Sequence, residues 1–233
     1  MLPAGLLATT GWQPVLPRNM HKSLALICPL KLIGVFCSMM RIWTIGHSTR
    51  SIEDFISLLE KNEIKLLADV RSLPGSKRYP HFNKEAFAKS LREHAIRYEH
   101  FPELGGRRKP KKDSRNTVWR NASFRGYADY METEEFHDGI ERLLAFARND
   151  GLGSRRNDRD GSETVTPWSA AIMCAEALWW RCHRALLSDY LNVRGIEVMH
   201  ILDANKSELH PFTSAARITH GTLSYATEED RLV

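Results

Sequence analysis

Apolar and polar positions alternate along the chain as expected of a mixed α/β protein. Five short segments have the length and composition of strands: 41–46, 65–71, 97–101, 170–174 and 196–202. Apolar residues recur at helical spacing in five further segments: 52–59, 87–95, 119–131, 136–147 and 179–191. This order predicts a single α/β domain with a mostly parallel sheet and helices on both faces, Rossmann-like and doubly wound.

The same pattern sets the expected limits of the domain at residues 40–205. Residues 1–39 hold interrupted apolar stretches, none as long as the roughly 18 apolar residues of a membrane helix, and are predicted to be a poorly ordered extension. Residues 150–167 are polar and rich in glycine, and are predicted to form a flexible loop. The pattern fades after 205, so 206–233 is expected to be a C-terminal tail.

Capping residues support two of the predicted helices. Ser51 and Asn83 are each placed to cap the helix that follows. Asp54 stands three residues after Ser51, as in a capping box. Both helices are therefore expected to begin at these positions.

The stretch 170–191 is the most informative part of the chain. An apolar strand leads through Ala175 to Ala177 into an amphipathic helix in which Trp179, Cys182 and Leu186 share a face. The turn then lies at the carboxyl end of the strand, where open α/β sheets bind their ligands. Reactive and charged residues at this turn predict a functional site there.

Composition and charge narrow the class of protein. The 233 residues are 42% hydrophobic, enough for one sizeable core, and the formal net charge is +5. The run 107–112 carries five basic residues, so the excess is better described as a local basic patch. Four cysteines make no disulfide framework, so a reducing cytoplasm is expected. Because no apolar stretch is long enough for a membrane helix, no membrane association is predicted.

Polar residues follow each predicted strand and would gather at one edge of a parallel sheet. One hypothesis is that they bind or act on a phosphate-bearing substrate, a nucleotide or a nucleic acid. The candidate catalytic residues are His47, Glu176, Cys182 and His183. The candidate anion-binding residues are Ser48, Arg71, Ser72, Ser76, Arg78, Gly105, Gly106, Arg107, Tyr127 and Arg184.

Within this hypothesis, His47 or His183 would be the general acid or base and Glu176 would orient a partner. Arg71 and Arg184 would hold the anion. The basic segment 107–112 could contact a nucleic acid. The chain has neither a Walker A motif nor a GxGxxG motif, so no cofactor is indicated by these loops.

Two alternatives start from other residues. Cys174, Cys182 and His183 are soft ligands that could form a metal site, although the spacing of the cysteines is not that of a zinc finger. In a variant of this alternative, Cys182 is a reactive thiolate. A third hypothesis is a non-catalytic partner-binding module, for which Trp179 and Trp180 are the candidate surface.

The motifs also resemble a known family, the domain of unknown function 488 family of compact bacterial α/β proteins. The matching pieces, spread over about residues 41–202, are Thr44–Ser48, Asp69–Ser76, Glu103–Gly106, Gly126–Tyr127, Cys174–Glu176 and Cys182–Arg184. The resemblance implies an α/β fold and a site at these residues. It implies no established reaction.

Overall fold

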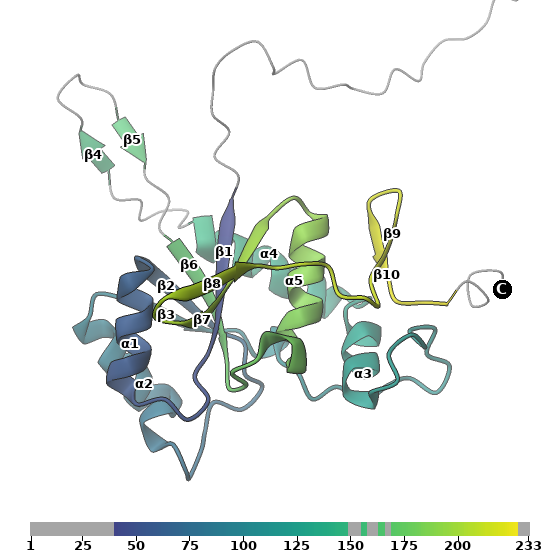
Figure 1. Cartoon of the computed structure of the whole chain (residues 1–233), viewed down its shortest axis with the longest axis horizontal. Helices are drawn as coiled ribbons and strands as arrows, with labels where there is room; N and C mark the ends of the chain where they lie inside the picture. Colours follow the sequence, from purple (N-terminus) through teal and green to yellow (C-terminus); the bar gives the residue numbers. More distant parts are fainter. Residues whose placement is uncertain (1–39, 149–154, 158–162, 166–168, 228–233) are drawn as a thin grey trace, which may run out of the picture. The chain divides into compact units, whose positions relative to one another are not determined.

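A six-stranded sheet is the centre of the folded domain (Figure 1). The computed structural model describes residues 40–148, 155–157, 163–165 and 169–227. In chain order, the sheet strands are β1 (Arg41–Gly46), β2 (Ile64–Asp69), β3 (Arg97–His100), β6 (Ser169–Cys174), β7 (Glu197–Asp203) and β8 (Lys206–Leu209). The spatial order is β3-β2-β6-β1-β7-β8, and all pairs are parallel except β7 with β8. The predicted α/β class with a mostly parallel sheet is confirmed.

The described chain has five α-helices, and residues of each belong to the two apolar clusters: α1 (Ile52–Lys61), α2 (Lys84–Glu93), α3 (Ala122–Tyr130), α4 (Glu134–Arg148) and α5 (Arg184–Val193). Alternate residues of β6 belong to two separate apolar clusters. Ala171 and Met173 pack with residues of α1 and α2, whereas Ala170 and Ile172 pack with residues of α3, α4 and α5. The period of two along the strand therefore gives each face of the sheet its own core.

The two predicted helix caps differ in the structure. The Ser51 hydroxyl accepts a hydrogen bond from the Asp54 N–H at 3.0 Å, so this cap is confirmed. Asn83 precedes α2 but makes no side-chain cap, because its amide oxygen accepts from the Ser76 N–H at 2.6 Å. Asn83 therefore fixes the loop after β2 rather than the helix.

The fold extends beyond residue 205, which corrects the predicted tail. Strand β8 joins the sheet edge, and β9 (Arg217–Thr219) pairs with β10 (Thr222–Ser224). Tyr225 is buried in the larger apolar cluster. Polar residues and short strands in this part hid its packing from the apolar pattern.

Two further boundary predictions fall largely outside the described residues. Within the predicted loop 150–167, β4 (Arg155–Asn157) and β5 (Glu163–Val165) pair in antiparallel fashion. The predicted extension 1–39 lies outside the described residues. Among the helices that are described, none has the length and apolar character needed to cross a membrane.

The helix predicted within 170–191 begins later than expected. Residues Trp179–Arg181 form a 3-10 turn (η4), and Cys182 is extended with φ −124° and ψ 151°. The first residue of α5 is Arg184, not a residue near Ala177. The intervening loop brings the carbonyl groups of Glu176 and Ala177 to the Arg184 side chain.

We expect Gly46→Ala to destabilise the domain strongly. A Cβ at Gly46 would overlap the backbone carbonyl of Glu176 and come within 2.8 Å of the Ala177 Cα. Overpacking against backbone costs about 1–3 kcal/mol or more. Urea denaturation measures the loss, with Gly75→Ala as the matched control because a Cβ there meets nothing within 4 Å. Equal stabilities of the two variants would contradict the prediction.

Candidate functional site

A cavity of about 400 Å³ lies where β2 and β6 end. Its walls come from the loops after β2, β3 and β6 and from the segment before α3. The lining residues are Arg71, Ser72, Leu73, Gly106, Arg107, Asn121, Ser123, Phe124, Cys174, Ala175, Glu176, Arg181, Cys182 and His183. Parallel strands thus bring segments about a hundred residues apart to one edge of the sheet.

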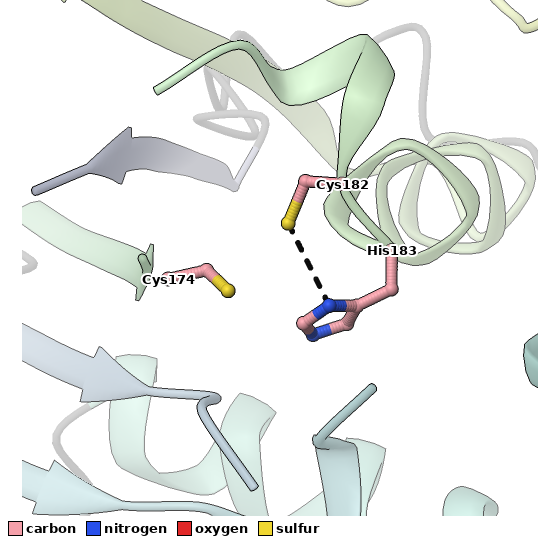
Figure 2. A group of neighbouring side chains, drawn as sticks. All are labelled: Cys174, Cys182 and His183. Carbon is pink, nitrogen blue, oxygen red and sulfur yellow. Dashed lines mark hydrogen bonds between the residues drawn. The ribbon is translucent and has the colours of Figure 1, made fainter. Parts of the chain in front are cut away.

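Three potential ligand or nucleophile side chains meet in this cavity. Figure 2 shows Cys174, Cys182 and His183 pointing toward one common space. One ligand atom from each lies within 4.8 Å of the others, and the Cys182 Sγ is 3.6 Å from the His183 Nδ1. Both cysteines are free and buried. This group can supply a thiolate nucleophile or three soft metal ligands.

Local structure places each member of the group. Cys174 is the last residue of β6, and Cys182 joins the 3-10 turn η4 to the start of α5. His183 packs its ring against Tyr127, with the ring centroids 4.9 Å apart. A Cβ on Gly106 would lie 2.8 Å from the His183 Nδ1, so only glycine lets the histidine sit here.

The second imidazole nitrogen of His183 has a special position. The Nε2 atom is buried and has no hydrogen-bond partner among the described residues. A buried polar atom without a partner is unfavourable unless a ligand or water meets it. His183 lines the cavity, so its Nε2 is buried close to the space that a bound molecule would occupy.

Arg184 is the most unusual buried side chain beside the site. It is 1% exposed, and no carboxylate of the described residues pairs with it. Its Nε lies 3.5 Å from the Cys182 Sγ, and its Nη2 donates to the carbonyls of Glu176 and Ala177. Its Nη1 lies 3.4 Å from the Thr44 hydroxyl. The Cys182 sulfur, 3.5 Å from Nε, is a contacting group that can carry a balancing negative charge.

The two thiols differ sharply in acidity. A hydrogen bond from Cys174 lowers the pKa of Cys182 well below its usual value, and the charges of His183 and Arg184 lower it further against the effect of burial. The same hydrogen bond, together with burial, raises the pKa of Cys174 well above its usual value. The pair therefore favours a Cys182 thiolate that accepts from a Cys174 thiol.

Arg71 lines the cavity but is already engaged. Its Nε and Nη2 donate to the buried Asp69 carboxylate at 2.9 and 2.6 Å, and Nη2 also donates to the Phe82 carbonyl at 2.9 Å. Tyr98 donates to the same carboxylate at 2.7 Å. This network fixes Arg71 at the cavity wall and leaves Nη1 as the less committed end of its guanidinium.

His47 lies behind Arg71 rather than in the cavity wall. Its Nδ1 is 3.0 Å from the Ser48 carbonyl, and its Nε2 is 3.4 Å from the Arg71 Nη1. The ring stacks on Phe82. Burial and then the charge of Arg71 lower the pKa of His47 to about 4. At neutral pH this histidine is an uncharged partner of Arg71, which does not suit the predicted role of general acid.

The structure thus separates the predicted residues into two sets. Those that line the cavity are Arg71, Ser72, Gly106, Arg107, Cys174, Glu176, Cys182 and His183. Those that do not line it are His47, Ser48, Ser76, Arg78, Gly105, Tyr127 and Arg184. The predicted anion contact of Arg184 is corrected, since its N–H groups are donated inside the protein.

Several residues outside the cavity support its wall. Gly105 packs against the Ser72 side chain, and the Tyr127 hydroxyl donates to the Leu104 carbonyl at 2.9 Å. Ser76 accepts from the Tyr79 N–H at 3.1 Å, and the Arg78 guanidinium lies over the Tyr79 ring. The Ser48 N–H donates to the Ala175 carbonyl at 2.8 Å. These contacts hold the loops that form the site.

Sequence reasoning missed two groups of residues. Asn121 and Ser123 line the cavity, and Asn121 caps α3 by accepting from the N–H groups of Ser123 and Phe124. The Asn-x-Ser pattern at a helix start could have indicated it. Four buried polar residues behind Arg184 were also missed: Thr44, Asp189, His200 and His210. Of the proposed surface pair, Trp179 is buried and Trp180 is 48% exposed.

Comparison with protein families identifies part of the chain. Residues 51–152 match the family described as domain of unknown function DUF488. The resemblance indicated by the motifs is confirmed. The match includes Arg71, Ser72 and Gly106, and ends before Cys174. No curated protein matches the chain, and no solved structure matches it.

His47 gives a prediction for pH. Its folded pKa of about 4 lies below the ordinary value of 6.5, so the neutral ring stabilises the fold fully above pH 6.5. This contribution is lost as the pH falls from 6.5 toward about 4, because the unfolded state binds the proton first. NMR of the ring nitrogens should show His47 titrating near pH 4.

The variant His47→Gln supplies the control for that titration. It should remove the assigned ring signals and reduce the loss of stability between pH 6.5 and 4 measured by urea denaturation. An unchanged pH dependence, or a His47 ring that titrates near pH 6.5, would show that the ring is not held neutral by burial and Arg71.

Proposed function

We propose that the chain is a cysteine-dependent enzyme whose Cys182 thiolate attacks a phosphate-bearing substrate held in the cavity. One observation carries the proposal: the buried Arg184 guanidinium, without a carboxylate partner in the described chain, lies 3.5 Å from the Cys182 Sγ. A buried charge needs an opposite charge or a shifted pKa. The thiolate supplies that charge, and it is the reactive form of cysteine.

The neighbouring groups have complementary roles in such an attack. Sγ forms a bond to the electrophilic atom of the substrate, and the bond to the leaving group breaks with its electron pair. Cys174 donates a hydrogen bond to the thiolate before attack. The His183 Nε2, which lacks a partner in the described structure, is placed to give a proton to the leaving group.

The cavity rim supports an anionic substrate. Arg107 and Arg181 are exposed lining cations, and Asn121 and Ser123 add polar contacts. In a doubly wound, Rossmann-like arrangement, which we propose for this sheet, ligands bind beyond the carboxyl ends of the strands. The polar rim around Cys182 lies in that position and favours phosphate oxygens.

The basic segment 107–112 extends this rim in a fixed conformation. The buried Asp129 carboxylate accepts from the Lys111 N–H at 2.8 Å and from the Ser114 hydroxyl at 2.6 Å. Arg108 is engaged over the Tyr130 ring, whereas Arg107, Lys109 and Lys112 are exposed. These exposed cations suit a nucleotide or nucleic acid substrate.

A metal site is the second candidate, favoured by the closeness of the two sulfurs and the His183 nitrogen. Zinc commonly takes three protein ligands and a water at catalytic sites. Metal content separates the two candidates, because a stable zinc site would hold about one equivalent through purification, and Cys182→Ser would lose it. A nucleophilic thiolate predicts no stoichiometric metal.

The first test is the reactivity of Cys182 toward iodoacetamide at pH 6. A thiol of ordinary pKa is about 0.3% ionised there, so a Cys182 thiolate should react about tenfold faster than free cysteine. Peptide mapping by mass spectrometry resolves it from the other three cysteines. Cys174→Ser, which replaces a thiol donor with a hydroxyl, should keep Cys182 reactive, whereas Cys182→Ser should remove the labelled peptide. Slow labelling at pH 6 would refute the thiolate.

The second test asks whether phosphate groups bind beside Cys182. Inorganic phosphate and a nucleotide should protect Cys182 from iodoacetamide, and Arg107→Ala or Arg181→Ala should weaken that protection about ten- to a hundredfold, as expected for a lost charge-assisted contact. Arg92→Ala, at an exposed position on α2, is the control. In this variant phosphate and the nucleotide should protect Cys182 as well as they do in the parent protein. Equal protection in all variants would exclude these arginines from the binding site.

A further inference from the structure

A line of buried hydrogen bonds leads away from Arg184. The Thr44 hydroxyl lies 3.4 Å from the Arg184 Nη1 and 2.6 Å from the His200 Nδ1. The His200 Nε2 lies 2.8 Å from the His210 Nδ1. The His210 Nε2 lies 3.0 Å from an Asp189 carboxylate oxygen. Each of these residues is at most 3% exposed.

The two ends of the line fix the direction of their own hydrogen bonds, because Arg184 can only donate and the Asp189 carboxylate accepts. A guanidinium can only donate, so the Thr44 oxygen accepts from Arg184 and its O–H is free to donate to His200. The Nδ1 of His200 then accepts, and its Nε2–H donates to His210. The Nε2–H of His210 donates in turn to the carboxylate. In this arrangement every donor points toward Asp189, and each ring nitrogen of the two histidines has a partner.

Each residue of the line is held by a different element. Thr44 on β1 is opposite His200 on β7 in the parallel register, so their side chains share a face of the sheet. His210 follows β8, and its backbone N–H donates to the Val198 carbonyl. The Trp179 ring stacks on His200 with the planes 8° apart. The histidine rings are thus fixed independently of Arg184.

Asp189 closes the line as a fully satisfied carboxylate. It lies in α5 and accepts from the Thr213 N–H and hydroxyl and from the Tyr225 hydroxyl, at 2.9, 2.6 and 2.9 Å. Burial lowers the pKa of His200 to about 2, so the His200 ring is neutral. Hydrogen bonds in such an aligned chain polarise one another, so the charge of the Asp189 carboxylate favours the guanidinium at the other end.

We propose that Asp189, His210, His200 and Thr44 are positioning residues that orient the Arg184 guanidinium toward the Cys182 sulfur. The inference rests on the proposed role of Cys182 as a thiolate nucleophile. Without the Thr44 oxygen, Nη1 of Arg184 has no acceptor among the described residues, and the guanidinium can turn toward the loop carbonyls. The Cys182 thiolate would then lose the Arg184 guanidinium beside it, and the sulfur would become less reactive.

The test measures the rate of Cys182 alkylation by iodoacetamide at pH 6 in the full-length protein. Thr44→Val removes the hydroxyl at nearly constant volume and should slow alkylation about tenfold. Thr44→Ser keeps the hydroxyl and should restore the parent rate. Asp189→Asn removes the charge at the far end and should also slow alkylation, which keeps the test available if Thr44→Val does not fold.

Tyr225→Phe is the control for a purely structural role. It removes a hydrogen bond to the same Asp189 carboxylate but leaves the line to Arg184 intact, so it should lower the melting temperature without changing the alkylation rate. The inference is overturned if Thr44→Val and Asp189→Asn lose stability but alkylate like the parent protein. Slow alkylation of the parent itself would instead overturn the proposed thiolate, and the positioning role with it.

Discussion

The site depends on one buried positive charge. Removing a guanidinium from water costs several kcal/mol, and this cost must be offset by hydrogen bonds and an opposite charge. Arg184 has acceptors at Glu176, Ala177 and Thr44, but among the described residues none of these is a carboxylate. The stabilising anion that we propose is the Cys182 sulfur, which would make the burial of one arginine and the ionisation of one cysteine the same physical requirement.

The sheet supplies the geometry for this requirement. Strand β1 pairs in parallel with both β6 and β7. This register places Gly46 of β1 opposite Cys174 of β6, and Thr44 of β1 opposite His200 of β7. Gly46 at the end of β1 lets the Glu176 carbonyl approach where a Cβ would block it, and that carbonyl accepts from Arg184. Strand register and one glycine thereby decide whether the guanidinium can be buried at all.

Sequence patterns predicted the five parallel strands and the closeness of Cys174, Glu176, Cys182 and His183, because apolar runs and parallel pairing act over short, regular distances. They failed where polar side chains are buried. Thr44, His200 and His210 interrupt apolar runs, and the extended Cys182 breaks a helical spacing that continues through it. Arg184 was predicted to bind the anion of a substrate because its polarity, too, gave no sign that it would be buried. Periodicity records which residues are polar, but tertiary contacts decide which way they point.

The contrast between the two cysteines shows why neither sulfur can be understood from its burial alone. Both are less than 9% exposed, and burial by itself would raise the pKa of each. Cys174 ends a strand and donates its hydrogen bond inward, so it remains a thiol. Cys182 precedes a helix, accepts that hydrogen bond and faces Arg184 and His183. Two buried thiols that both line the cavity therefore have pKa values shifted in opposite directions, upward for Cys174 and downward for Cys182.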